Sequence, residues 1–140
     1  MAILVTGGAG FIGTHTCVEL LQAGEKIVVF DNFHNSKMSA VEAVKELTGE
    51  NFPFYQADML DADAMEHIFS QNDITEVIHF AGLKAVGESV QKPLAYYHNN
   101  ITGTLVLLQA MQRHGCKRIV FSSSATVYGA PKTVPIREDF

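Results

Sequence analysis

Short apolar runs alternate along the chain with longer segments in which apolar residues recur at helical spacing. The apolar runs predict strands, and the first two, which are rich in β-branched residues, predict strands buried on both faces. The runs span Ala2–Thr6, Lys26–Phe30, Phe52–Gln56, Val77–Phe80 and Arg118–Ser122. The longer segments predict helices over Phe11–Ala23, Met38–Leu47, Ala62–Phe69 and Pro93–Arg113. This alternation predicts an α/β fold in which helices cover both faces of a parallel sheet, with right-handed crossovers.

Residues at the ends of these segments agree with the prediction. Gly24, Gly49 and Gly115 each follow a predicted helix, where glycine commonly ends one. Asp61 stands where an N-cap is expected, and Pro93 fits the first turn of the last helix. We therefore expect four helices between five strands.

A glycine-rich loop joins the first strand to the first helix. It fits the pattern GxGxxG through Gly8, Gly10 and Gly13, and the variant GxxGxxG through Gly7, Gly10 and Gly13. Gly7 or Gly8 would permit the tight turn, Gly10 would let a pyrophosphate approach the backbone, and Gly13 would let the helix pack close to the sheet. The helix N-terminus would attract the anion. The loop predicts a Rossmann-type doubly wound sheet, with a cleft where the strand order reverses.

Asp31 ends the second predicted strand, about 20 residues beyond the glycines. A carboxylate at this place accepts hydrogen bonds from the ribose of a bound dinucleotide and repels a 2′-phosphate. NAD is therefore the predicted cofactor, in preference to NADP. The alternative is that Asp31 is a simple turn residue.

Composition and charge exclude several classes of protein. The 140 residues suit one domain, and 47% hydrophobic residues are too many for a disordered chain. The net charge of −5, without a basic stripe, argues against a nucleic-acid partner. No apolar run reaches the ~20 residues of a membrane span, and the first residues do not resemble a signal peptide. Cys17 and Cys116 match no metal-binding or redox spacing, and the histidines lack zinc-site spacing, so we expect a cytoplasmic protein without a metal site.

Several longer motifs resemble the extended short-chain dehydrogenase/reductase family. Asp58-Met59 and Phe80-Ala81-Gly82 follow predicted strands, as the corresponding residues do in that family. The stretches His79–Leu94, Asn99-Asn100 and Phe121–Gly129 are similar to the signature of its UDP-hexose 4-epimerases. The resemblance runs over essentially all of the chain.

The glycine loop, Asp31 and the resemblance together assign a set of site residues. Cofactor contacts are expected from Gly7, Gly10, Phe11, Ile12, Gly13, Asp31, Asn32, Phe33, His34, Asn35, Ser36, Asp58, Met59, Phe80, Ala81, Gly82, Leu83, Lys84 and Asn99. The resemblance also implies that Lys84 and Ser124 reach the substrate, Ser124 at the sugar hydroxyl on C4. Alternatives are that Asp58 caps a helix, that Lys84 and Asn99 are solvated surface residues, and that Ser122–Ser124 is a polar strand end.

The resemblance implies an NAD-dependent epimerase that inverts C4 of a UDP-hexose, UDP-glucose or UDP-galactose. The family's catalytic Tyr and Lys, four residues apart on one helix, are expected beyond residue 140. Tyr128 and Lys132 match this spacing, but Pro131 and Gly129 oppose a helix between them. We therefore expect residues 1–140 to be an incomplete NAD-binding domain without the substrate-binding region, inactive alone.

Two alternative functions remain open, and the resemblance also implies an assembly state. The chain could be a non-catalytic NAD-binding module, or part of another nucleotide-sugar epimerase or dehydratase. The dehydratase would need an acid/base pair just after the last strand, which Ser122–Thr126 does not supply. The resemblance implies a homodimer through the Pro93–Arg113 helix. The sheet, truncated before its final strand, would leave an open edge that promotes self-association.

Overall fold

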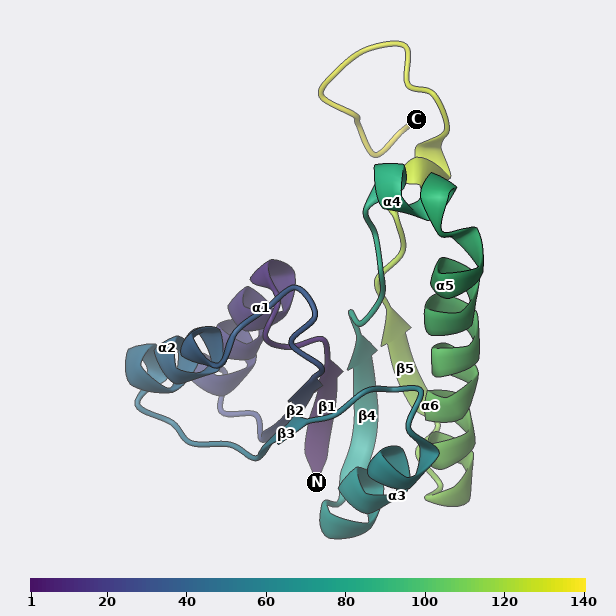
Figure 1. The fold of residues 1–140 in the computed structure, drawn as a ribbon. Coiled ribbons are helices and arrows are strands. Elements are labelled where there is room, and N and C mark those ends of the chain that lie inside the picture. The colour runs from purple at the N-terminus through teal and green to yellow at the C-terminus, as the bar shows by residue number, and fades with distance from the viewer.

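The five strands form one parallel sheet in the order β3-β2-β1-β4-β5 (Figure 1). The computed structural model describes residues 1–140. The strands are β1 (Ala2–Thr6), β2 (Ile27–Asp31), β3 (Phe54–Gln56), β4 (Ile74–His79) and β5 (Arg118–Phe121). The chain winds outward from β1 to β3 and then crosses to β4 on the other side of β1. The predicted doubly wound fold is confirmed, and its strand order reverses between β1 and β4.

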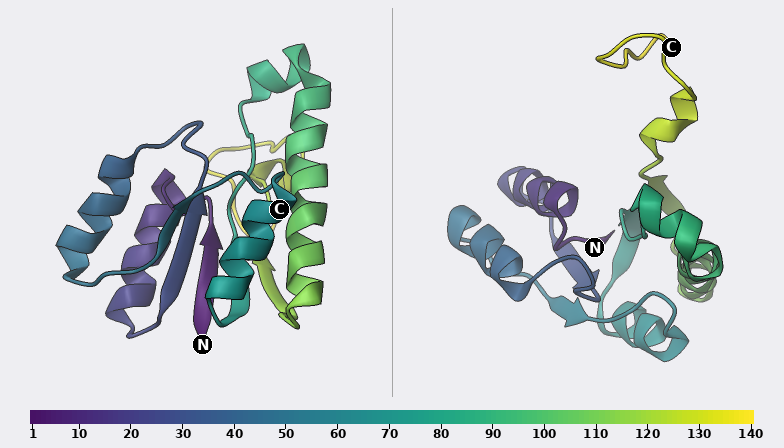
Figure 2. Two further views of the ribbon diagram at one scale, coloured as in Figure 1. Left: turned by 60° about the horizontal axis from the view of Figure 1, so that its bottom comes forward. Right: turned by 45° about the horizontal axis from the view of Figure 1, so that its top comes forward.

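Helices cover both faces of the sheet (Figure 1, Figure 2). The first two helices, α1 (Phe11–Gln22) and α2 (Met38–Thr48), pack together on one face, and α3 (Ala62–Gln71) and α6 (Gly103–Arg113) pack together on the other. The predicted helix from Pro93 is continuous, but its middle is a π-helical turn. It comprises α5 (Pro93–Tyr97), the π turn η1 (His98–Thr102) and α6.

One short helix was not predicted. It is α4 (Val86–Gln91), which precedes α5 and buries none of its residues. Without a buried side, its sequence has no apolar periodicity from which a helix could be predicted. A 3-10 turn, η2 (Ala125–Tyr128), follows β5.

The strands supply alternate side chains to two cores. Leu4 of β1 and Val28 of β2 are paired in register and belong to the core under α3 and α6. The next pair along the same strands, Val5 and Val29, belongs to the core under α1 and α2. Because both faces are covered, all five residues of β2 are buried. This explains the unbroken apolar run of β2 in the sequence.

Two strand boundaries differ from the predictions by more than one residue. β3 begins at Phe54, two residues late, because Phe52 is a buried core residue and Pro53 has no N–H with which to extend the ladder. β4 begins at Ile74, three residues early, because Thr75 and Glu76 interrupt the apolar run although the backbone is already paired.

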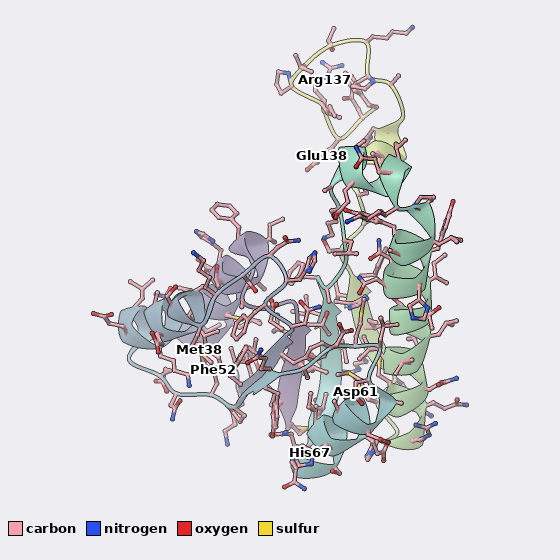
Figure 3. All side chains as sticks on the ribbon, in the orientation of Figure 1. Met38, Phe52, Asp61, His67, Arg137 and Glu138 are labelled. Atoms are coloured by element: carbon pink, nitrogen blue, oxygen red, sulfur yellow. The ribbon has the colours of Figure 1, made fainter.

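The predicted capping residues are confirmed, although α3 runs to Gln71, two residues beyond its predicted end. Asp61 Oδ1 accepts a hydrogen bond of 3.1 Å from Ala64 N and caps α3 (Figure 3). The glycines after α1, α2 and α6 have left-handed backbones, with φ of 82° at Gly24, 68° at Gly49 and 70° at Gly115. None of the helices combines the length and the apolar character needed to cross a membrane.

Two leucines, one buried and one exposed, test how far this core stabilises the fold. Leu107 of α6 is fully buried, whereas Leu47 of α2 is 71% exposed. We expect Leu107→Ala to lower the free energy of unfolding by about 2–5 kcal/mol, because it leaves a cavity between α6 and the sheet. Leu47→Ala should change it by less than about 0.5 kcal/mol. Urea unfolding of both variants measures this, and equal losses would contradict the burial of Leu107.

Candidate functional site

A cleft lies at the carboxyl ends of the central strands, where the strand order reverses. Parallel strands end at the same edge, so loops that are far apart in the sequence meet there. Fourteen of the predicted cofactor residues line it: Gly7, Gly10, Asp31, Asn32, His34, Asn35, Ser36, Asp58, Met59, Phe80, Ala81, Gly82, Leu83 and Asn99. The remaining two lining residues, Phe30 and Ala57, were not predicted.

The glycines of the loop have different structural roles. Gly7 has a φ of +65°, and a Cβ there would lie 2.8 Å from the backbone nitrogen of Ala81. A Cβ on Gly13 would collide with the Gly7 carbonyl oxygen. The fold itself therefore requires glycine at these two positions. Gly7 is the glycine of the tight turn.

Gly10 is different, because the fold does not require a glycine there. Its φ of −73° suits any residue, and an added Cβ would meet only the Gly7 carbonyl oxygen, at 3.4 Å. That is an ordinary van der Waals distance. Since Gly10 lines the cleft, a Cβ would take space in the cleft itself. The structure thus leaves room for a ligand to approach the backbone at Gly10.

The N-terminus of α1 is not capped by any side chain. Gly10 is the N-cap residue without a capping side-chain hydrogen bond, and the first turn contains no acidic residue. The first backbone N–H groups of a helix have no partner within it, and the helix dipole adds positive potential at this end. The backbone at Phe11 and Ile12 is therefore well suited to bind an anion such as a pyrophosphate.

Asp31 connects the glycine loop to the loop after β2. Its Oδ2 accepts a hydrogen bond of 3.2 Å from Ala9 N. Its Oδ1 accepts hydrogen bonds from Phe33 N at 2.9 Å and from Ser36 Oγ at 2.8 Å. Phe33 has a positive φ of 59°, so the chain turns sharply here. Asp31 is thus a turn residue, as the alternative from the sequence has it, and it also lines the cleft.

Asp58 joins the loops after β2 and β3. Its Oδ2 accepts a hydrogen bond of 3.1 Å from Asn32 Nδ2, and its Oδ1 accepts one of 2.9 Å from Leu60 N. The cap of α3 is Asp61, so the alternative that Asp58 caps this helix is wrong. Asp58 is free to face the cleft because another carboxylate caps the helix.

The turn after β4 is held from behind by a buried histidine. His79 Nδ1 lies 2.6 Å from Thr6 Oγ1, which accepts a hydrogen bond of 3.1 Å from Ala81 N. Burial, and secondarily the charge of Lys84, lowers the pKa of His79 from about 6.5 to about 4. His79 is therefore neutral at physiological pH.

A second side chain that sequence reasoning missed holds the same turn. Asn100 Nδ2 donates to the Leu83 carbonyl oxygen, and its Oδ1 accepts from Leu83 N, both at 2.8 Å. Only its neighbour Asn99 was assigned to the site from the sequence. The Asn99-Asn100 pair is visible in the sequence. The sequence does not show which side-chain amide lines the cleft and which one holds the turn after β4.

Five predicted residues lie next to the cleft without lining it: Phe11, Ile12, Gly13, Phe33 and Lys84. The side chains of Phe11 and Ile12 point into solvent, with exposures of 82% and 58%. The contacts predicted for these two residues involve the backbone, which is compatible with exposed side chains.

Ser124 also lies outside the lining of the cleft, on the segment that extends away from the sheet after β5 (Figure 1). Its Oγ accepts hydrogen bonds from Thr126 N at 3.2 Å and from Thr126 Oγ1 at 2.8 Å, and it begins η2. This turn ends at Tyr128, and Gly129 has a φ of 68°. Tyr128 and Lys132 therefore do not share a helix, as the sequence analysis concluded. Farther along the segment, Arg137 and Glu138 lie well away from the sheet (Figure 3).

The doubly wound sheet, the glycine loop at the start of α1 and the acidic residue ending β2 define a Rossmann-type dinucleotide-binding protein. Residues 4–140 match the model of a family described as GDP-mannose 4,6 dehydratase. The chain therefore belongs to this family, within the extended short-chain dehydrogenases/reductases.

Its relatives include UDP-glucose 4-epimerases. The whole chain is 64% identical to the UDP-glucose 4-epimerase of Bacillus subtilis (strain 168), and 99% of it is 60% identical to that of Haemophilus influenzae. It spans 41% of the length of either enzyme. The crystal structure of UDP-glucose 4-epimerase from Bifidobacterium longum in complex with NAD+ and UDP matches 99% of the chain at 55% identity, with a TM-score of 0.92. The chain covers 42% of that structure.

The lowered pKa of His79 predicts a pH dependence of stability. Between pH 6.5 and pH 4 the unfolded chain binds a proton that the folded chain does not. The part of the free energy of unfolding that depends on a neutral His79 is fully present above pH 6.5. It is lost as the pH falls toward 4, by up to about 3 kcal/mol. Urea unfolding at pH 7 and pH 4.5 should show a larger loss for the wild type than for His79→Gln. Equal losses would mean that other groups cause the dependence.

Proposed function

We propose that this chain is the NAD-binding part of an epimerase that inverts C4 of a UDP-hexose, interconverting UDP-glucose and UDP-galactose. The observation that carries the proposal is the cleft, where the open helix end, the space at Gly10 and the Asp31 carboxylate lie together. Identity of 64% to an enzyme named UDP-glucose 4-epimerase supports the choice of reaction. Residues 1–140 would form the cofactor domain of such an enzyme.

Each wall of the cleft suits one part of NAD. The pyrophosphate would lie at Gly10 and the first turn of α1, where the backbone N–H groups are free. The adenosine ribose would lie against Asp31 and the loop Asn32–Ser36, and the adenine beside Asp58-Met59. A buried carboxylate at the ribose disfavours a 2′-phosphate, so NAD is favoured over NADP. Phe80–Leu83 and Asn99 would close the opposite wall.

A retained cofactor is what this reaction requires. NAD, when bound, takes the hydride of C4 and returns it to the other face of the sugar, so net oxidation is zero. Loops after β1, β2, β3 and β4 all contribute to the cleft, which favours retention. Lys84, exposed beside the cleft, would contact the cofactor near the sugar.

Ser124 would donate a hydrogen bond to the C4 hydroxyl group. Its oxygen accepts hydrogen bonds from Thr126, which leaves its own proton free to donate. No tyrosine and lysine four residues apart share a helix in residues 1–140. We therefore expect these residues alone to bind cofactor without turning over UDP-galactose.

Two of the glycines provide a test of NAD binding that leaves the fold intact. We expect calorimetry to detect NAD binding to the chain, and Gly10→Ala to weaken it by at least about tenfold because the methyl group takes the place of the pyrophosphate. Gly87→Ala is the matched control, since a Cβ at Gly87 meets nothing within 4 Å. NADP should bind more weakly than NAD.

Three results would count against the proposal. The first is a folded wild-type chain that binds no NAD, which would remove the cofactor role. The second is a Gly10→Ala variant that binds as tightly as Gly87→Ala, which would place the ligand elsewhere. The third is equal affinity for NAD and NADP, which would remove the role of Asp31 as the residue that selects the cofactor.

We also propose that the chain forms a homodimer through the helix that begins at Pro93. Exposed apolar residues recur along it at spacings of three and four: Leu94, Tyr97, Ile101, Leu105 and Leu108. Their exposed fractions range from 40% to 82%. A continuous apolar stripe of this kind is typical of a helix that packs against another helix.

Sedimentation analysis tests this association. We expect a dimer for the wild type and a shift toward monomer for Leu105→Lys, because a charge buried in the interface is unfavourable. Leu47→Lys, at a 71% exposed position of α2 outside the proposed interface, should remain dimeric. A wild type that is monomeric at every concentration, or equal behaviour of the two variants, would contradict the proposed interface.

The cytoplasm is the compartment that we propose. Cys17 and Cys116 are both free, buried thiols, and burial raises the pKa of Cys17 to about 12. A chain whose cysteines are unpaired and unreactive suits a reducing environment.

A further inference from the structure

The turn Phe80–Leu83, one wall of the cleft, is held by residues that do not themselves line the cleft. Asn100 pairs with both the N–H and the carbonyl oxygen of Leu83, as a neighbouring strand would. Its Oδ1 also accepts a hydrogen bond of 3.0 Å from Asn99 Nδ2. One side chain thus fixes both the backbone of the wall at Leu83 and the orientation of the cleft-lining amide of Asn99.

A hydrogen-bonded relay connects Asn100 to the other end of the same turn. Thr104 Oγ1 donates its only proton to the backbone carbonyl oxygen of Asn100, at 2.6 Å. It must therefore accept from His79 Nε2, 3.1 Å away, so the proton of the neutral imidazole is on Nε2. His79 Nδ1 then accepts from Thr6 Oγ1, and that oxygen accepts from Ala81 N.

The donor and the acceptor of every hydrogen bond in this relay are therefore determined. Thr6 holds the turn at Ala81, Asn100 holds it at Leu83, and His79 and Thr104 connect the two holders. Asn99 and Asn100 are consecutive residues of the π turn η1, which places both side chains on the side of the helix toward the cleft. Side-chain networks in which every member is satisfied fix a single local conformation.

We propose that Asn100 is a positioning residue for the cofactor, acting through the Leu83 backbone and the Asn99 amide, with the Thr104–His79–Thr6 relay fixing the other end of the turn. The inference rests on the proposed function, since it assigns the residue that shapes the wall of the NAD cleft. Asn100 does not touch the ligand in this assignment. Its effect on affinity arises from the positions of Leu83 and Asn99.

Asn72 provides a matched control for the test. It is partly buried like Asn100, and its Nδ2 donates to Tyr55 Oη at 3.0 Å and to the Ile68 carbonyl oxygen at 2.9 Å, remote from the cleft. Asn72→Ala therefore removes two hydrogen bonds of the same kind without changing the wall. Asn100→Asp is the conservative variant, because its carboxylate still accepts from Leu83 N and Asn99 but cannot donate to the Leu83 carbonyl oxygen.

The experiment measures NAD affinity by calorimetry and the exchange rate of the Leu83 amide by NMR without NAD. We expect Asn100→Ala to weaken NAD binding by about tenfold and to speed exchange at Leu83, with Asn100→Asp between it and the wild type. Asn72→Ala should bind within about twofold of the wild type, even if it is equally destabilised. If Asn100→Ala does not fold, Asn100→Asp decides the test by the same comparison.

The possible failures are distinguishable. Absence of NAD binding by the wild type would defeat the proposed function, and unchanged Leu83 exchange in the Asn100 variants would then defeat the inference as well. A wild type that binds NAD, together with Asn100 variants that bind equally well, would overturn the inference alone. Equal losses of affinity in Asn72→Ala and Asn100→Ala would also overturn it, because the effect would then be general destabilisation.

Discussion

The architecture of the cleft depends on the carboxylate of Asp31. It is almost fully buried and accepts three hydrogen bonds, from Ala9 in the glycine loop and from Phe33 and Ser36 in the next loop. Burying a carboxylate is costly unless its oxygens are satisfied, and hydrogen bonds to a charged acceptor are among the strongest. These bonds therefore fix two loops with respect to each other. The same carboxylate gives the cleft its negative charge where a ribose would lie.

The rest of the cleft is built largely from backbone. Gly7 permits a contact with the backbone of Ala81 that any Cβ would prevent, so the loops after β1 and β4 touch directly. Gly10 leaves free space in front of the α1 N-terminus. The wall opposite Asp31 is a turn whose backbone groups are paired with Thr6 and Asn100. At Gly10, where no side chain projects into the cleft, a ligand can approach the backbone closely.

Much of this site could be predicted because its determinants are local. A strand, a glycine loop, a helix and an acidic residue follow one another within about 30 residues, and their order implies the geometry. Other features depend on neighbours that sequence spacing does not identify. Asp58 and Asp61 are both suitable helix caps, and only the fold shows that Asp61 has this role while Asp58 pairs with Asn32. The helix α4 was missed because it buries no side chain, and the π turn because a single extra residue does not change the apolar pattern visibly.

The sequence by itself determined the class of fold, the position of the glycine loop, the position of Asp31 at the end of β2 and the resemblance to epimerases. Strand burial and glycine geometry leave direct traces in residue type, so these features can be inferred without coordinates. The tertiary structure decided which residues hold the cleft from behind. His79 meets Thr6 across 73 residues, and Asn100 meets Leu83 across 17. The role of a buried polar side chain depends on the partner that folding brings within hydrogen-bonding distance. Its position along the chain does not identify that partner.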